Sequence, residues 1–191
     1  MELLHLLNSI YPMSEELKMD ITQALKTEII YKKELLHRQG KIMSRIYFIE
    51  RGLFRCYYSN SADKEICAWF MSDGDVIVSV ESFFKQVPSN EAIQALEDSI
   101  VHSISYAQLQ TIYKSHLEFN YVARVLTEKY YCQSEQRLFW LRHTKARDRY
   151  ALFLASFPDL VRKVPSTYIA SFLGVTLETL SRIKKIKTEK I

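Results

Sequence analysis

The amino-acid sequence predicts an α+β protein in which an antiparallel β-sandwich, roll or barrel is followed by a helical C-terminal part. Between residues 27 and 105, short runs rich in Ile, Val, Tyr and Phe alternate with turn-forming residues, which is typical of short antiparallel strands. Residues 117–143 contain neither Pro nor Gly and predict one long helix. Residues 166–187 show the spacing of two short helices joined by a turn.

Composition narrows the class of protein further. The chain has 191 residues, of which 48% are apolar and 25% charged, so it is expected to fold, as one domain or as two small ones. No apolar run approaches the roughly 18 residues of a membrane-spanning helix. The N-terminal segment MELLHLLNSIYP lacks the basic start and long apolar stretch of a secretory signal. We therefore expect a cytoplasmic protein without a membrane partner.

The cysteine and histidine residues do not form a recognisable metal or disulfide motif. Cys56, Cys67 and Cys132 are an odd number, widely spaced, and none belongs to a C-x-x-C pair. The five histidines are equally scattered, with no H-x-H or H-E-x-x-H arrangement. We expect reduced thiols, no metal and no cofactor.

The remaining elements follow from local patterns. Residues 3–26 have apolar positions at helical spacing and predict one or two short helices, with Ser14 as an N-cap before Glu15 and Glu16. The expected strands are EIIY, RIYFIERG, LFRCYYS, EICAWF, DVIVSV, EAIQAL and IVHSIS. Helical patterns return at residues 106–116 and 146–157, and a turn and a short link lead from Pro158 to Pro165.

Charge is concentrated near the C-terminus. Residues 142–191 hold eleven Lys or Arg against four Asp or Glu, a net of +7, which leaves residues 1–141 with fifteen against eighteen, or −3. A basic segment on a slightly acidic molecule is the electrostatic footprint of nucleic-acid binding, although a solvated basic helix face gives the same count.

The segment from Ser166 to Lys187, STYIASFLGVTLETLSRIKKIK, matches a helix-turn-helix at every constrained place. Ala170 stands where a second helix crosses closely, and Gly174 stands where the turn needs a positive φ. Five places that hold two crossing helices together are apolar; they are Ile169, Leu173, Val175, Leu180 and Ile183. The alternative is an ordinary helical hairpin with Gly at its C-cap.

The second helix of this motif is predicted to present a polar face to DNA. Thr176 is its expected N-cap, and Glu178, Arg182 and Lys185 fall on the outward face. Arg182 can donate to guanine and Glu178 can accept from cytosine, although the two also suit a simple surface ion pair. The residues expected to contact phosphates are Thr167, Thr179, Ser181, Lys184 and Lys187.

The long helix is predicted to pair with a second copy of itself. At ~1.5 Å per residue it spans about 40 Å and outruns a small β-domain, although packing of one face against its own β-domain is the alternative. We assigned the seam to the positions that follow a 3-4 spacing, which are Phe119, Val122, Leu126, Tyr130, Gln133, Arg137 and Trp140.

The order of these elements and the motif GVTLETLSRIKK resemble the Crp/Fnr family of bacterial transcription regulators. The resemblance implies a cyclic-nucleotide-binding-like β-roll at residues 1–116, a dimerisation helix at 117–143 and a helix-turn-helix domain with a reduced wing at 144–191. It also implies double-stranded DNA, a second copy of the chain and RNA polymerase as partners. Glu178 and Arg182 match the family's base-reading pair, Thr179 matches a phosphate contact, and Leu177 replaces a further base-reading Arg.

The resemblance also points to an effector pocket that departs from the family pattern. The places of the cyclic-AMP-binding Gly-Glu and Arg-Ser pairs fall on Val78 and Ser79 and on Ser89 and Asn90, while Tyr131 and Cys132 align approximately with residues that touch the base. No basic residue remains for the phosphate, and an unpaired charge there costs several kcal/mol. We therefore expect no cyclic AMP binding and leave the effector open.

Three classes of function follow, in decreasing order of support. The first is a homodimeric regulator that reads an inverted repeat in DNA. The second is a small-molecule sensor whose helix-turn-helix contacts a partner protein, which the polar outward face argues against because such helices expose apolar anchors. The third is a cupin-like enzyme, for which His37 and His102 alone do not supply a metal cluster.

Overall fold

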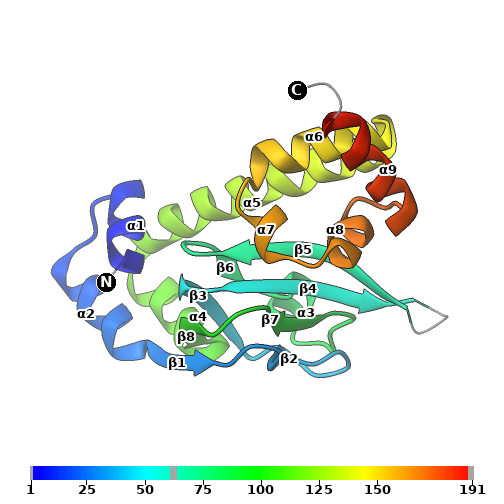
Figure 1. The fold of residues 1–191 in the computed structure, drawn as a ribbon. Helices are drawn as coiled ribbons and strands as arrows, with labels where there is room; N and C mark the ends of the chain where they lie inside the picture. Colours follow the sequence, from blue (N-terminus) through cyan, green and yellow to red (C-terminus); the bar gives the residue numbers. More distant parts are fainter. Residues whose placement is uncertain (1, 61–63, 189–191) are drawn as a thin grey trace. The chain divides into compact units, whose positions relative to one another are not determined.

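A computed structural model describes residues 2–60 and 64–188 (Figure 1). These residues form two compact units, which we describe separately. Unit 1 comprises residues 2–58 and 70–129, and unit 2 comprises residues 59–60, 64–69 and 130–188. Unit 1 contains most of the β-structure, whereas unit 2 consists mainly of helices and includes the end of one hairpin. The division at residue 116 remains a prediction.

Two short helices open unit 1, as the sequence predicts. Helix α1 spans Glu2–Ile10 and α2 spans Glu15–Ala24. The hydroxyl of Ser14 accepts a hydrogen bond from the N–H of Leu17 at 3.2 Å, which confirms Ser14 as the N-cap of α2. Both helices bury one apolar stripe, and Leu17 within that stripe is fully buried.

Eight strands form two four-stranded sheets, which confirms the antiparallel roll. One sheet has the order β1-β8-β3-β6 and the other β2-β7-β4-β5. The strands are β1 (Lys26–Ile30), β2 (Leu35–His37), β3 (Arg45–Arg51), β4 (Leu53–Ser59), β5 (Glu65–Ser72), β6 (Val76–Ile77), β7 (Ala92–Ala95) and β8 (Ser99–Ser105). The sequence did not predict β2, and the expected strand DVIVSV is only two residues long because Ser79 starts a helix.

The tight connection between β3 and β4 depends on Gly52. Its φ is +142°, and a Cβ placed there would lie 2.1 Å from the hydroxyl oxygen of Ser99. The N–H of Gly52 donates to the carboxylate of Asp73 at 2.6 Å. Glycine is therefore required at this position for steric as well as conformational reasons.

Helices α3 (Val80–Lys85) and α4 (Tyr106–Ser115) complete the β-roll, and α5 (Leu117–His143) follows after the single non-helical residue His116. The bounds of α5 agree with the predicted long helix. A capping box starts α4, in which Ser105 and Gln108 each bond the backbone N–H of the other. The first part of α5 belongs to unit 1 and the rest to unit 2.

Unit 2 ends in four helices: α6 (Ala146–Ser156), α7 (Leu160–Lys163), α8 (Ser166–Phe172) and α9 (Leu177–Thr188). The predicted link before Pro165 contains the single turn α7. Between residues 144 and 188 the structure shows no strand, in agreement with the expected reduced wing.

The described residues, 2–60 and 64–188, include no helix with the length and hydropathy of a membrane span. In the same residues, no group of three or more His, Cys, Asp or Glu side chains is placed to hold a metal ion. Cys56 and Cys67 are buried and Cys132 is exposed, and none of the three forms a disulfide.

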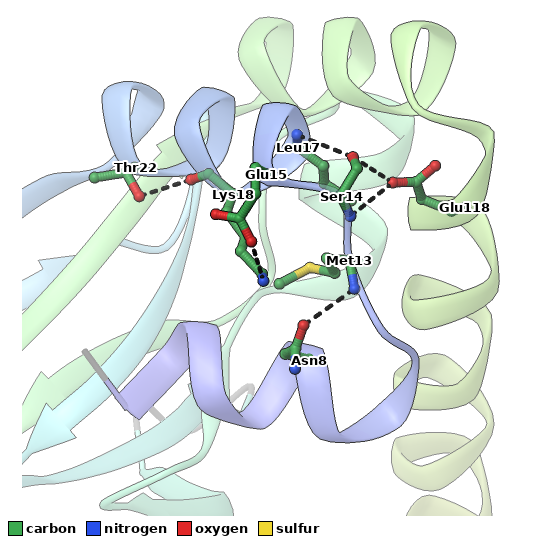
Figure 2. A network of polar contacts seen from close by, with 8 residues as sticks. All are labelled: Asn8, Met13, Ser14, Glu15, Leu17, Lys18, Thr22 and Glu118. Carbon is green, nitrogen blue, oxygen red and sulfur yellow. Dashed lines mark hydrogen bonds and ion pairs between the residues drawn. The ribbon is translucent and has the colours of Figure 1, made fainter.

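The junction of α1, α2 and α5 is held by a polar network centred on Ser14 (Figure 2). The carboxylate of Glu118, in the first turn of α5, accepts from the hydroxyl of Ser14 at 2.6 Å and from its N–H at 3.2 Å. The side-chain oxygen of Asn8, on α1, accepts from the N–H of Met13 at 3.0 Å. Hydrogen bonds therefore tie the loop between α1 and α2 both to α1 and to α5. These hydrogen bonds favour the ionised carboxylate and lower the pKa of Glu118 below its ordinary value of 4.5.

This network predicts a pH-dependent contribution to stability. Because the folded-state pKa of Glu118 is depressed, its contribution is present above pH 4.5 and is lost as the pH falls through the folded pKa. Glu118→Gln is therefore expected to be less stable than the wild type at pH 7, with the difference shrinking toward pH 3. Urea unfolding at a series of pH values measures it. Glu16→Gln, at an exposed position on α2, is the matched control, and an unchanged difference across this range would contradict the prediction.

Candidate nucleic-acid interface

The turn between α8 and α9 is a complete Schellman motif. Gly174 has a φ of +64°, the N–H of Val175 donates to the carbonyl of Ala170 at 3.0 Å, and the N–H of Gly174 donates to that of Ser171 at 3.0 Å. The sequence predicts this positive φ. The motif ends α8 abruptly and sends the chain into α9 after only four residues.

Two arginine side chains donate hydrogen bonds to the carbonyls of Phe172 and Leu173 at the end of α8. Arg137, on α5, donates to the carbonyl of Phe172 at 3.0 Å, and its guanidinium carbon lies 3.6 Å from the centre of the Phe172 ring. Arg149, on α6, donates to the carbonyl of Leu173 at 2.8 Å and to that of Thr144 at 2.7 Å. The last carbonyls of a helix have no partner within the helix and attract positive charge. The end of α8 is thus tied to α5 and α6.

Burial confirms the predicted inward set of the α8–α9 pair. Ala170 is 3% exposed and is the only small residue among large ones. The apolar places are Ile169 at 0%, Leu173 at 3%, Leu180 at 0% and Ile183 at 9% exposure, with Val175 half-buried. The two helices are therefore held by an apolar core, which leaves the opposite face of α9 to solvent.

The first turn of α9 is capped as predicted. The hydroxyl of Thr176 accepts from the N–H of Thr179 at 3.2 Å, and the carbonyl of Thr176 accepts from the N–H of Leu180 at 3.0 Å. The N–H groups of the first helical residues, Leu177 and Glu178, point out of the same end of the helix, as they do at any helix N-terminus. Such N–H groups suit a phosphate.

The outward face of α9 surrounds an open hollow of about 420 Å³. Its lining brings together five residues: Leu177, Glu178, Ser181, Arg182 and Lys185. All five are exposed, and the last four belong to the predicted DNA-contacting set. Leu177 is the one lining residue outside that set, because the set consists of polar residues and Leu177 is apolar.

The other predicted phosphate contacts whose side chains the structure describes lie on α8 and α9, outside the lining of this hollow. Thr167 is exposed in the first turn of α8. Thr179 is half-buried and bonded to Thr176 through their hydroxyl groups at 3.0 Å. The ammonium of Lys184 donates to the hydroxyl of Ser166 at 2.8 Å, so this positive charge is held near the start of α8.

Burial varies along the predicted seam on α5, whose role in a dimer stays a prediction. Val122 is fully buried, Phe119 is 8% exposed with its ring 5.5 Å from that of Tyr113, and Arg137 is engaged with Phe172. Leu126, Tyr130, Gln133 and Trp140 are half-buried. This stripe therefore lies toward residues of the same chain, because its larger apolar side chains are covered there. A second stripe at 4-3 spacing is exposed; it contains Leu117, Tyr121, Arg124, Glu128, Tyr131, Glu135, Leu138 and Arg142.

Of the predicted pocket residues in the β-roll, the structure brings together only Ser79 and Ser89. Their hydroxyl oxygens lie 2.9 Å apart, and both residues are less than 5% exposed. Ser89 also accepts from the N–H of Glu91 at 2.9 Å. Val78 is half-buried and Asn90 is exposed. In unit 2, Tyr131 is 65% exposed and Cys132 is exposed as well.

Comparisons with known proteins identify the fold. The family described as "Cyclic nucleotide-binding domain" matches residues 28–116. FixK2 from Bradyrhizobium japonicum superposes with a TM-score of 0.72, at 22% identity over 87% of this chain and 86% of that chain. The c-di-GMP responsive global regulator CLP from Xanthomonas campestris gives 0.74, at 14% identity over 93% of each chain. The catabolite activator protein of Thermus thermophilus gives 0.58, at 16% identity over 97% and 87%.

No curated protein matches the chain in sequence. Residues 28–116 are thus similar to the cyclic nucleotide-binding domain family, and the chain shares its fold with regulators of the Crp/Fnr family, in agreement with the resemblance that the sequence indicates.

Proposed function

We propose that this protein is a transcription regulator of the Crp/Fnr type that binds an inverted repeat in double-stranded DNA as a homodimer and has no enzymatic activity. One observation carries the proposal: Glu178, Arg182 and Lys185 surround an exposed hollow on a helix that follows a fixed turn. A helix of this kind suits the major groove, where a guanidinium recognises guanine and a carboxylate recognises cytosine. In this assignment, α8, the turn and α9 are the helix-turn-helix.

Charge supports the same assignment. The net charge of +7 over residues 142–191 provides counterion release on a phosphate backbone. Thr167 on α8 and Lys184 on α9 are suited to contact phosphates, which positions the helix without reading sequence. The half-buried residues Arg137 and Arg149 serve a different purpose, since both guanidinium groups donate to carbonyls at the end of α8.

The exposed stripe of α5 is the proposed dimer interface. Tyr121, Tyr131 and Leu138 supply large apolar contact area at heptad spacing, with exposures of 46%, 65% and 40%. Arg124 and Glu128 form an ion pair on the same stripe, so charged side chains lie between these large apolar ones. Two copies joined along this stripe would carry two copies of α9, which suits half-sites about 34 Å apart.

Regulation is proposed to pass from the β-roll through α5 and a hinge at residues 143–145. Thr144 is the first residue after α5, and its hydroxyl donates to the carbonyl of Trp140 at 2.7 Å. This hydrogen bond ties the start of the link to the last turn of α5. RNA polymerase is the proposed further partner, by resemblance. The effector remains open, and cyclic AMP is not expected because Ser79 and Ser89 bond each other where the family has its ligand-binding Glu and Arg.

A second candidate is a sensor whose α8–α9 pair docks on a partner protein. The exposure of Leu177, at 47%, favours it, because protein-binding helices expose apolar anchors. The surrounding polar side chains favour DNA, so we keep DNA as the leading proposal.

The DNA-reading role predicts two distinct mutant phenotypes. Arg182→Ala should reduce discrimination at one base pair of each half-site by roughly 1–3 kcal/mol, because a bidentate contact is lost. Lys184→Ala should weaken all sequences about equally and lower the slope of log K against log salt by about one for each phosphate contact removed. Selection of oligonucleotides followed by binding titrations at several salt concentrations measures both.

Ser166→Ala is the matched control for Lys184→Ala, since it removes the hydrogen-bond partner of Lys184 and keeps the charge. Its salt slope should equal that of the wild type. Binding that is independent of sequence, with Arg182→Ala indistinguishable from Lys184→Ala, would contradict the base-reading role.

The serine pair predicts the response to cyclic AMP. Calorimetric titration of the folded, full-length protein should show no binding in the micromolar range, because Ser89 and Asn90 stand at the places of the family's phosphate-binding Arg-Ser pair and an uncompensated buried charge costs several kcal/mol. The same preparation, assayed for DNA binding, controls for folding. A micromolar dissociation constant would overturn the interpretation of Ser79 and Ser89.

The dimer interface predicts that charge on the exposed stripe separates the chains. Leu138→Glu should raise the dimer dissociation constant at least about tenfold, since it places like charges together across a two-fold axis. Analytical ultracentrifugation measures the change. Gln136→Glu adds the same charge at an exposed position off the stripe and should leave the dimer intact; equal effects of the two variants would show that α5 uses another face.

A further inference from the structure

An exposed aromatic surface lies where the loop between α1 and α2 meets the start of α5. Tyr11, in that loop, and Tyr121, on α5, have ring centres 5.3 Å apart and are 45% and 46% exposed. Leu117, one turn earlier on α5, is 80% exposed. The guanidinium carbon of Arg124 lies 4.9 Å from the centre of the Tyr121 ring. We call these four residues of unit 1 the aromatic surface.

The loop is closed by contacts that do not involve the ring of Tyr11. The N–H of Met13 donates to Asn8, and the N–H and hydroxyl of Ser14 donate to Glu118 (Figure 2). The side chain of Met13 is 5% exposed and anchors the loop in the core of unit 1. The exposed ring of Tyr11 is therefore not a requirement of the turn between the two helices.

These contacts make the aromatic surface rigid, and its composition indicates a protein partner. A tyrosine that is already held in place loses little conformational freedom when a partner covers it. Tyrosine and arginine are enriched at the centres of protein interfaces. The carboxylates of Glu118 and Glu128 lie on the same part of α5, which disfavours a polyanion such as DNA on this surface.

The place of Tyr121 indicates that this partner is a second copy of the chain. Tyr121 belongs to the exposed stripe of α5, whose spacing of four and three residues is that of helices that pair along their length. A helix with its side chains is about 10 Å wide. Because the rings of Tyr11 and Tyr121 are only 5.3 Å apart, a helix that covers Tyr121 also reaches Tyr11.

The aromatic surface is also suited to contact a copy of itself. A two-fold axis brings the same patch of both chains together, so the patch has to be self-complementary. Aromatic rings pack well against one another in tilted or edge-on arrangements, and a guanidinium group stacks on an aromatic ring. Each chain supplies both kinds of group, through Tyr11 and Tyr121 and through Arg124.

We propose that the loop between α1 and α2 is part of the contact between two copies of this chain, with Tyr11 packed against the partner. This inference rests on the proposed function, because it takes the exposed stripe of α5 as the dimer interface. It extends that interface from one helix to two segments that are about a hundred residues apart in the sequence.

Substitutions of Tyr11 test the contact through the dissociation constant of the dimer. Tyr11→Asp should raise this constant about tenfold or more, because a symmetric interface contains the substitution twice and each new carboxylate is placed in the contact. Tyr11→Phe keeps the ring and should stay within about threefold of the wild type. Tyr31→Asp is the matched control, since Tyr31 is 63% exposed and follows β1, outside α1, α2 and α5. Sedimentation equilibrium of the full-length protein measures the constant, and circular dichroism checks that each variant is folded.

Hydrogen exchange tests the same contact without any substitution. Above the dissociation constant of the dimer, the backbone N–H groups of residues 7–14 should exchange more slowly than below it, together with those of α5. Residues 31–34 should exchange at the same rate under both conditions. Protection of α5 without protection of residues 7–14 would overturn the inference.

The outcomes separate this inference from the proposed dimer. If Leu138→Glu separates the chains while Tyr11→Asp behaves like the wild type, the role of Tyr11 is overturned and the dimer along α5 stands. Equal effects of Tyr11→Asp and Tyr31→Asp also overturn the role of Tyr11, because they show a general effect of added charge. A wild-type chain that sediments as a monomer while it binds its selected operator overturns both the proposed dimer and this inference.

Discussion

The end of α8 is the constraint on which the candidate interface depends. A helix of only seven residues is not stable by itself, and its last four carbonyls have no partner within the helix. Here the carbonyls of residues 169–171 accept from N–H groups of the cap and the turn, and that of Phe172 accepts from Arg137. Arg149 bonds the next carbonyl, that of the C-cap residue Leu173. Because the turn is fixed in this way, α9 leaves it in one direction, and its polar face is held clear of the apolar core.

The same arrangement gives two kinds of arginine in unit 2. Arg137 and Arg149 are used on carbonyls and contribute packing and orientation, while Arg182 is exposed beside the hollow. A count of positive residues does not separate them. What separates them is distance from a helix C-terminus, where positive charge is stabilised by the helix dipole. This division explains how a basic segment can both build a domain and present charge to a polyanion.

In unit 1 the predicted pocket positions include a buried pair of serines that is fully hydrogen-bonded. Ser79 and Ser89 bond each other, and Ser89 also bonds the backbone of Glu91, so these buried hydroxyl groups have partners without a ligand. The β-roll around them consists of two antiparallel sheets, with Phe54 and Ile93 in its core. Under the proposed function, two hydroxyl groups stand where the family has a charged pair, which lowers the affinity expected for an anionic ligand.

The sequence by itself determined the order of elements, the bounds of α5, the N-cap at Ser14, the turn at Gly174 and the inward set of the α8–α9 pair. Each of these depends on neighbours within a few residues, so local spacing is sufficient. The strand β2 was not predicted from the sequence, because its pairing with β7 depends on residues far along the chain. Only the tertiary structure decided which stripe of α5 is covered. Phe119 and Tyr121 each begin a repeat at 3-4 spacing, and which repeat is buried depends on the residues that pack against the helix. The contact of Arg137 with Phe172 was also decided by the tertiary structure alone, because the two residues are far apart in the chain. The same holds for the place of Leu177 in the lining of the hollow, since no local pattern predicts it.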